Sequence, residues 1–466
     1  MPIKGPERYR MENVHFIAIG GSAMHNLALA LKYKGLTVTG SDDKIFEPSR
    51  TRLDKEGLLP EAEGWFPEKI HAGLDGIVLG MHAKKDNPEL LKAIELGLPI
   101  FSYPEFLYEQ SKDKTRVVIG GSHGKTSTTS IILHVLNSLE QEVDYMVGAQ
   151  LDGFDRMVKL TKEAKSIVLE GDEYLSSPLD LRSKFLLYKP HIAVLTGIAW
   201  DHVNVFPTFQ SYLDTFRAFL DLIDPAGVLI YNEDDKQLVD LIAEKKRAYR
   251  LIPYTAHTSR IDNAQTILTN GSGEVPIQIF GDHNLMNLQA AFHVLTEMNI
   301  SEKEMYGAIP SFSGASKRLE KLVDRPDLKV YKDFAHSPSK VEATLNAVCE
   351  QFKGWEVMVC FELHTYSSLS AGFMAEYRNT MQGMHKGLVF YNKEALRIKR
   401  LPDIAKEVVS EAFDNPELQI ANRGEEVLEF VNTEFNPEAK QVWLMMSSGD
   451  FDGMIIKDMF PVVEVQ

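Results

Sequence analysis

Short apolar runs recur along the chain, and most of them end in glycine or a polar residue just before a stretch with helical periodicity. Examples are the runs at residues 14–19, 117–119, 166–169 and 192–195. Short runs without alternation are typical of strands buried on both faces of a parallel sheet. Since parallel strands need crossover connections that are usually helical, the pattern predicts an α/β fold with mostly parallel sheets.

The length of 466 residues exceeds that of one ordinary domain, and a prior of roughly 100–200 residues per domain predicts three. The order of strands and helices places a Rossmann-like domain at residues 1–109. A phosphate-loop domain is expected at 110–314 and a second Rossmann-like domain at 315–466. Within the first domain, Asn87 is expected to cap a helix.

The amino-acid composition limits the classes of protein to which the chain can belong. The hydrophobic fraction of 44% and the charged fraction of 25% are those of a soluble globular protein. The net charge of −16 argues against nucleic acid or an anionic membrane as the main partner. No apolar run approaches the span of a bilayer or forms a signal peptide, so a cytoplasmic location is expected. Cys349 and Cys360 are expected to be buried thiols in a reducing compartment.

The segment 116–130 combines a buried strand, a glycine turn and a helix start. In such a turn, backbone N–H groups, the helix dipole, the ammonium of Lys125 and the hydroxyl of Thr126 converge on one spot, which favours phosphate and magnesium. The match to G-x-x-x-x-G-K-[ST] is incomplete, because Ile119 stands where the first glycine belongs. The alternative is a structural turn with a solvated lysine. The candidate nucleotide-binding residues here are Gly121, Ser122, His123, Gly124, Lys125, Thr126 and Ser127.

A similar strand, turn and helix opens the chain, and Asp42 lies about twenty residues beyond its glycines. This arrangement serves nucleotides with a ribose diol, although Ala18 and Ala23 occupy the outer glycine positions of the fingerprint. A tight structural turn is an equal alternative, and an NAD-dependent dehydrogenase is a distant one. The candidate substrate residues are Gly20, Gly21, Ser22, Ala23, Met24 and Asp42.

Two further strands end in metal-ligand side chains. Glu170 closes the strand at 166–170, and His202 follows the strand at 191–196. Because the carboxyl ends of parallel strands share one sheet edge, both are expected near Lys125 and could together hold a divalent cation, separate from the magnesium expected at Thr126. The alternatives are a helix cap for the acid and a structural role for the imidazole.

The remaining candidates lie after residue 280. Asn284 and Asn287 are three residues apart and share a helix face, where their carboxamides could contact a purine or ribose. Helix capping is the alternative, mainly for Asn284. A strand at 328–333 ends in Asp333 and leads through His336 into a helix.

Several motifs occur in this chain in the order in which the Mur ligases carry them, so the chain resembles that family. The Mur ligases use ATP to form amide bonds in peptidoglycan synthesis. The resemblance covers almost the whole chain. Its motifs are Gly-Gly-Ser-Ala-Met at 20–24, Gly-Ser-His-Gly-Lys-Thr at 121–126, Glu-Gly-Asp-Glu at 170–173, Asp-His at 201–202, His-Asn-x-x-Asn at 283–287, Lys-Arg-Leu-Glu at 317–320 and Asp-Phe-Ala-His-Ser-Pro at 333–338.

The resemblance implies a UDP-N-acetylmuramate site in the first domain, ATP and magnesium in the second, and an incoming amine at the third. A carboxylate resists attack by an amine, so it must first become an acyl phosphate, a step that needs positioning and positive charge. The domains are then expected to close to exclude water. The implied catalytic residues are Lys125, Glu170, His202 and Arg318, with Asn284, Asn287, Arg318 and Asp333 at the nucleotide, Glu173 as a helper and His336 at the amine.

Two branches of the family remain open. The segment Asp180–Phe185 is similar to members that recycle an intact murein tripeptide, L-alanyl-γ-D-glutamyl-meso-diaminopimelate. The segment Phe361–Ser367 is instead similar to members that add L-alanine. The first resemblance is favoured, while Ala18 and Leu175 depart from both branches. A monomer or weak homodimer is expected.

Overall fold

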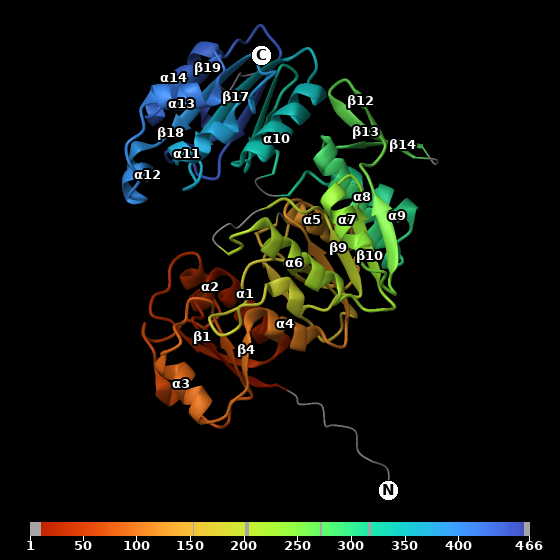
Figure 1. Ribbon diagram of the computed structural model, residues 1–466, viewed down its shortest axis with the longest axis vertical. Helices are drawn as coiled ribbons and strands as arrows, with labels where there is room; N and C mark the ends of the chain where they lie inside the picture. The colour runs from red at the N-terminus through yellow and green to blue at the C-terminus, as the bar shows by residue number, and fades with distance from the viewer. Residues whose placement is uncertain (1–10, 152, 201–204, 271–272, 316–317, 461–466) are drawn as a thin grey trace. The chain divides into compact units, whose positions relative to one another are not determined.

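The computed structural model describes residues 11–460 except 152, 201–204, 271–272 and 316–317 (Figure 1). The chain forms two compact units: one runs up to residue 255 and includes 289–305, and the other comprises 256–288 and the chain from 306 on. The predicted α/β class is confirmed, because parallel pairing dominates three of the four sheets. The boundaries at 109 and 314 stay predictions.

The first unit begins with a four-stranded parallel sheet of order β2-β1-β3-β4. Asn87 accepts hydrogen bonds from the N–H groups of Glu89 and Leu90, so the predicted helix cap is confirmed. The elements are β1 Asn13–Ile17, α1 Ser22–Lys34, β2 Thr37–Ser41, α2 Ser49–Lys55, β3 Gly76–Leu79, α3 Pro88–Glu95, β4 Ile100–Ser102 and α4 Tyr103–Ser111.

A seven-stranded sheet of order β11-β10-β9-β5-β8-β6-β7 follows, parallel except for β7. Its central strand β5 pairs with β8 on one side and β9 on the other. The elements are β5 Thr115–Gly120, α5 Lys125–Ser138, β6 Asp144–Met146, β7 Val158–Lys159, β8 Ser166–Glu170, β9 Ile192–Leu195, α6 Phe209–Leu220, β10 Val228–Asn232, α7 Lys236–Ala243 and β11 Arg250–Tyr254.

The second unit contains a small antiparallel sheet of order β12-β13-β14, which the sequence pattern did not predict. Its first turn places Asn263 and Ala264 at φ values of 48° and 60°, the left-handed backbone of a tight hairpin. The strands are β12 Ser259–Asp262, β13 Gln265–Asn270 and β14 Gly273–Ile277. The helices that follow in the chain, α8 Asp282–Glu297 and α9 Glu302–Ala308, belong in part to the first unit.

The last sheet has the order β15-β16-β20-β17-β18-β19, and only β15 is antiparallel. All six side chains of β20 are buried, with Leu444 in one apolar cluster and Trp443 in another, so helices cover both faces. The elements are β15 Glu320–Asp324, β16 Leu328–Asp333, α10 Pro338–Gln351, β17 Glu356–Leu363, α11 Ala371–Met374, β18 Lys386–Tyr391, α12 Lys393–Ile398, α13 Lys406–Phe413, β19 Leu418–Ala421, α14 Gly424–Glu434 and β20 Gln441–Met446.

The two cysteines differ in their burial. Cys360 is a buried thiol of β17, but Cys349 on α10 is only half-buried, which corrects the prediction for that residue. Its helical position leaves part of the side chain facing outward. Within the described ranges, none of the helices combines the length and the apolar character that crossing a membrane requires.

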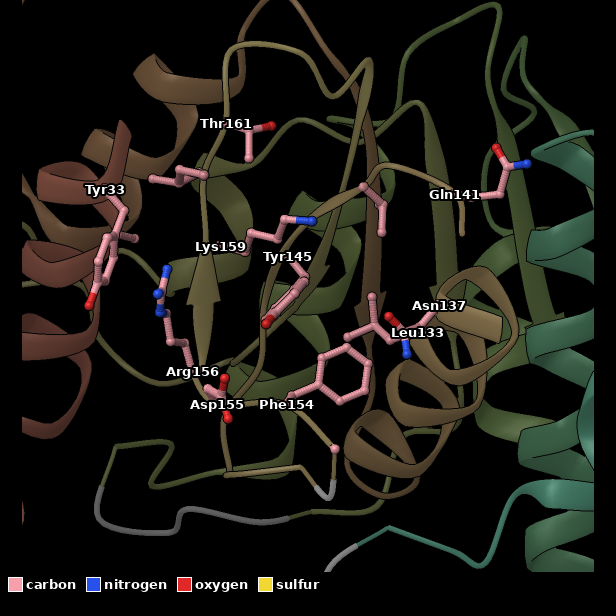
Figure 2. Close-up of a pocket in the computed structure, with 14 residues that line it drawn as sticks. Tyr33, Leu133, Asn137, Gln141, Tyr145, Phe154, Asp155, Arg156, Lys159 and Thr161 are labelled. Atoms are coloured by element: carbon pink, nitrogen blue, oxygen red, sulfur yellow. The ribbon is translucent and has the colours of Figure 1, made fainter. Parts of the chain in front are cut away.

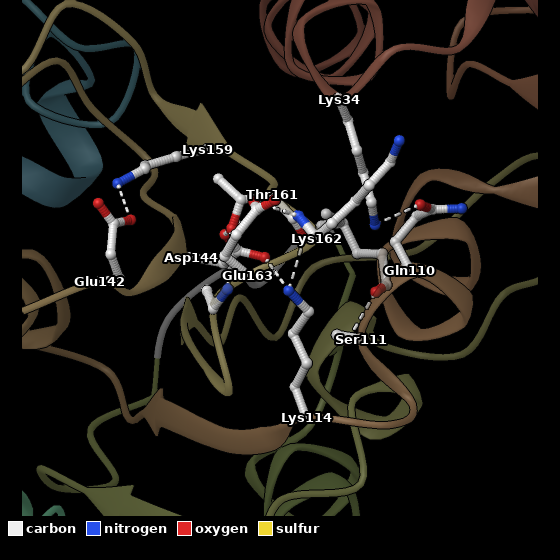
Figure 3. A network of polar contacts seen from close by, with 12 residues as sticks. Lys34, Gln110, Ser111, Lys114, Glu142, Asp144, Lys159, Thr161, Lys162 and Glu163 are labelled. Carbon is white, nitrogen blue, oxygen red and sulfur yellow. Dashed lines mark hydrogen bonds and ion pairs between the residues drawn. The ribbon is translucent and has the colours of Figure 1, made fainter.

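A buried ion pair ties the start of β5 to the start of β6 (Figure 3). The Lys114 Nζ donates to Asp144 Oδ2 at 2.5 Å and to the Thr161 carbonyl at 2.8 Å. Asp144 Oδ1 accepts from the Thr161 N–H and hydroxyl. Because the two charged side chains are only 6% and 0% exposed, each depends on the other for compensation.

Asp144→Ala should therefore lower the free energy of unfolding by about 3–5 kcal/mol, since it leaves a buried ammonium without its partner. Urea denaturation measures the loss. Lys159→Ala is the matched control, because its pair with Glu142 is solvent-exposed and contributes about 0–1 kcal/mol. The double variant Lys114→Met/Asp144→Leu should recover much of the loss; equal losses for Asp144→Ala and Lys159→Ala would contradict this account.

Candidate active site

The turn between β5 and α5 depends on two glycines with left-handed backbone. Gly121 has φ 123° and Gly124 has φ 85°, whereas Gly120 is an ordinary strand residue. A Cβ at position 121 would also overlap the Thr196 hydroxyl. In the described part of the chain, the N–H groups of Gly124, Lys125 and Thr126 have no hydrogen-bond acceptor. The turn thus presents a row of donors at a helix N-terminus.

The Lys125 ammonium is held over this turn. Its Nζ donates to the Gly121 carbonyl and to Glu173 Oε2, the latter at 2.9 Å. Glu173 is buried, and its other oxygen accepts from the Tyr212 hydroxyl at 3.3 Å. The ion pair with a fixed carboxylate restricts an otherwise flexible lysine to the phosphate loop.

Glu170 meets Thr126 at the same edge of the sheet. Thr126 Oγ1 donates to Glu170 Oε1 at 2.9 Å, and the Gly148 N–H donates to Oε2 at 3.0 Å. This contact follows from the parallel register, in which Ile119 of β5 lies opposite Glu170 of β8. A hydroxyl beside a carboxylate offers the hard oxygen ligands that magnesium prefers.

His202 lies outside the described residues, as does Asp201. Among the residues that are described, no cluster of three His, Cys, Asp or Glu side chains could hold a metal ion. Thr126 and Glu170 still fit a magnesium ion that also binds phosphate oxygens, because magnesium typically takes only one or two protein carboxylates. The donors at Gly124–Thr126 and the Lys125 ammonium likewise fit a nucleoside triphosphate.

Thr196 is a residue that the sequence reasoning missed. It follows β9, and its hydroxyl donates to the carbonyls of His123 and Gly120. Asp235 holds the next turn through the Ile198 N–H at 2.6 Å. The position of Thr196 at a carboxyl-terminal strand end was the available signal, but a threonine there has no distinctive spacing.

At the first turn of the chain, Asp42 binds the protein's own backbone. Its Oδ2 accepts from the Gly20 N–H at 2.7 Å, and burial raises the pKa of Asp42 to about 6. The strand expected at 14–19 ends at Ile17, because Ala18 has a left-handed φ of 69°. These contacts favour the structural-turn alternative for Asp42. The site roles of Gly20–Met24 stay predictions.

In the second unit, Asp333 organises the backbone near Arg318 and His336. Its two oxygens accept from the N–H groups of Leu319 at 2.7 Å and Ala335 at 2.8 Å. The Arg318 guanidinium lies 5.2 Å from the centre of the Phe334 ring. Asp333 therefore holds both the residue that precedes β15 and the turn that follows β16.

Asn284 and Asn287 differ in their surroundings. The Asn284 Nδ2 donates to the Phe280 carbonyl at 2.9 Å, a bond to the residue four positions earlier in the chain. It is not a helix cap, in which a side-chain oxygen accepts from a backbone N–H group of the first turn. Asn287 is buried on the same helix. A nucleotide contact by either carboxamide stays a prediction.

A cavity of about 310 Å³ lies beside α5, and Tyr33 of α1 and Tyr145 of β6 are among the residues that line it (Figure 2). The Arg156 guanidinium stacks 3.4 Å from the centre of the Tyr33 ring. Leu133 and Asn137 of α5 also line the cavity, and they lie about 12 Å or more along the helix from Lys125. The cavity is thus separate from the phosphate loop, and no predicted site residue lines it.

Two models of one protein family match the chain. Residues 119–295 match the Mur ligase middle domain, and residues 13–115 match the Mur ligase family catalytic domain. UDP-N-acetylmuramate–L-alanine ligase of Carboxydothermus hydrogenoformans is 30% identical over 86% of each chain. The ligase of the same name from Caldicellulosiruptor saccharolyticus is 33% identical over 82% of this chain and 83% of its own.

Solved structures show the same fold. A murein peptide ligase of Psychrobacter arcticus aligns over 95% of this chain and 97% of its own, with a TM-score of 0.61 and 23% identity. UDP-N-acetylmuramate–alanine ligase of Thermotoga maritima aligns over 95% and 96%, with a TM-score of 0.65 and 19% identity. The protein is therefore a three-domain α/β ligase that forms amide bonds with release of ADP. The chain belongs to the Mur ligase family, and the dehydrogenase alternative is not retained.

The geometry of Gly121 gives a direct test of the phosphate loop. Gly121→Ala and Gly57→Ala both place alanine at a left-handed φ, which costs about 1–2 kcal/mol. Only Gly121→Ala adds an overlap, with Thr196, which should cost about 1–3 kcal/mol more. Urea denaturation should show this difference, and titration with a fluorescent ATP analogue should show weaker binding for Gly121→Ala alone. Equal behaviour of the two variants would contradict the assignment.

Proposed function

We propose that the chain joins the lactyl carboxylate of UDP-N-acetylmuramate to the amino group of the murein tripeptide L-alanyl-γ-D-glutamyl-meso-diaminopimelate, using ATP and magnesium. The observation that carries the proposal is the placement of two carboxylates at one phosphate loop, with Glu173 on Lys125 and Glu170 on Thr126. A simple nucleotide-binding module has no need of a carboxylate beside the loop hydroxyl. Membership of the Mur ligase family supports the reaction type.

Each residue of the loop has a defined task in this reaction. Bound ATP would supply the phosphoryl group that activates the carboxylate. Bound magnesium would supply positive charge that offsets the negative oxygens of the phosphoryl group. The N–H groups of Gly124–Thr126 and the Lys125 ammonium bind the phosphate oxygens, while Glu173 keeps the ammonium in place. Thr126 and Glu170 would hold the cation, and the Gly148 N–H orients Glu170.

The other assignments follow the resemblance. His202 would add an imidazole ligand to the cation, Asn284 and Asn287 would contact the nucleotide, and Arg318 would reach its phosphates. Asp333 would complete the nucleotide site, and His336 would face the amine. A cytoplasmic, monomeric or weakly dimeric enzyme stays our expectation.

The segment 180–185 supports the tripeptide as the amine. Arg182 contacts both oxygens of Asp180 at 2.6–3.0 Å and also Glu105 of α4 at 3.2 Å. Phe185 is buried and stacks on Phe219 with ring centres 4.6 Å apart. The segment that resembles the recycling members is therefore a fixed feature of the fold. L-Alanine is the second candidate, supported by the names of relatives that are 30–33% identical over 82–86% of this chain.

Lys125→Ala should lower kcat for ADP release by about 10²–10³-fold, because it removes a positive charge aimed at the transferred phosphoryl group. The assay contains ATP, magnesium, UDP-N-acetylmuramate and the amine. Lys245→Ala is the control, since its ion pair with Asp221 is solvent-exposed and neither residue belongs to the loop. Unchanged ADP release in Lys125→Ala would refute the phosphate-loop assignment.

A competition assay identifies which amine is the substrate. With equal concentrations of L-alanine and the tripeptide, we expect kcat/KM to favour the tripeptide, measured as amide product by mass spectrometry. A preference for L-alanine would replace the first candidate by the second. Absence of ADP release with both amines would refute the ligase proposal for UDP-N-acetylmuramate.

A further inference from the structure

Besides Asp333 at the end of β16, a further carboxylate, that of Glu362, lies at the carboxyl-terminal edge of the six-stranded sheet, where β17 ends. Glu362 is 2% exposed, and its Oε2 accepts from the Phe451 N–H at 2.9 Å and from the Ser447 hydroxyl. Its Oε1 lies 3.3 Å from His364 Nδ1. Donors from the loop after β20 thus fix a buried carboxylate, and that carboxylate faces an imidazole.

The His364 ring is held on two sides. A Cβ on Gly449 would overlap the ring, so the glycine allows the loop to pack directly against it. An ionised carboxylate only accepts hydrogen bonds, so the Nδ1 of His364 carries the proton and Nε2 has a free lone pair. The side chain is 36% exposed, and within the described ranges its Nε2 has no partner. The pair therefore presents an oriented base to solvent.

Two buried hydroxyls lie at the same sheet edge. Ser337 follows β16 and Ser448 follows β20, and in the described structure neither hydroxyl has a hydrogen-bond partner. The strands β16, β20 and β17 are neighbours, so the three loops emerge side by side. Ligands of parallel sheets bind at this edge, and unpaired polar groups there are suited to a polar substrate.

We propose that His364, oriented by Glu362, accepts the proton of the incoming amine; the inference rests on the proposed ligase function. An amino group is largely protonated near neutral pH and cannot attack in that form. Transfer of one ammonium proton to His364 Nε2 frees the nitrogen lone pair, which forms the C–N bond. The C–O bond to phosphate then breaks with its electron pair, and the phosphate takes the second proton from nitrogen.

Glu362 is a positioning residue in this step. Its negative charge stabilises the imidazolium that forms and holds Nε2 outward, as carboxylates do for catalytic histidines. In the contacts described, Glu362 Oε1 is the carboxylate oxygen that meets the Nδ1 of His364, so the pair at β17 combines an oriented ring with a nearby negative charge.

The test uses hydroxylamine, a nucleophile that is already neutral near pH 7 and needs no base to attack an activated carboxyl group. Full-length wild type should form both the amide and, with hydroxylamine, the hydroxamate of UDP-N-acetylmuramate. His364→Gln should lower kcat for amide formation by about 10²–10⁴-fold, while hydroxamate formation stays close to that of wild type. Glu362→Gln should show the same split with a smaller loss.

The matched control is His385→Gln, because His385 lies at the opposite, amino-terminal end of β18 and should leave both rates unchanged. Thermal unfolding checks that each variant is folded. Equal loss of amide and hydroxamate in folded His364→Gln, or no loss of either, would overturn the inference while leaving the ligase proposal intact. Failure of wild type to form either the amide or the hydroxamate would instead overturn the ligase proposal itself.

Discussion

The pairing of β5 with β8 and β9 is the constraint on which the site depends. It places Ile119 opposite Glu170 and Gly120 opposite Leu195, so the glycine turn, a carboxylate and a threonine hydroxyl end at one sheet edge. A shift of one residue along β8 would turn Glu170 to the other face of the sheet. The chemistry of the loop is therefore fixed by backbone hydrogen bonds as much as by the side chains that take part.

At the phosphate loop, the charges close by matter more for an anionic ligand than the overall charge of −16. The loop concentrates one ammonium and a row of backbone donors, while Glu170 and Glu173 are buried and hydrogen-bonded. Both carboxylates would repel a phosphate chain on their own. Their charges are offset locally, because Glu173 is paired with the Lys125 ammonium and Glu170 accepts hydrogen bonds from the Thr126 hydroxyl and the Gly148 N–H.

The C-terminal sheet uses the same edge in a different way. Its strands also end in fixed acids, Asp333 on β16 and Glu362 on β17. Asp333 binds only backbone N–H groups and the Thr344 hydroxyl in the contacts described, whereas Glu362 also faces an imidazole. The contact partners, rather than the residue type, thus separate a carboxylate that shapes a loop from one that can support proton transfer.

The sequence by itself determined the α/β class, the glycine turn at 121–124, the Asn87 cap and the placement of Glu170 at a strand end. These are local features, because a strand, a turn or a cap depends on residues close together in the chain. It could not identify Glu173 as the partner of Lys125, Thr196 under the turn, or Glu362 beside Gly449. Those contacts join residues from different strands and loops, so only the tertiary structure, through sheet order and register, decided them.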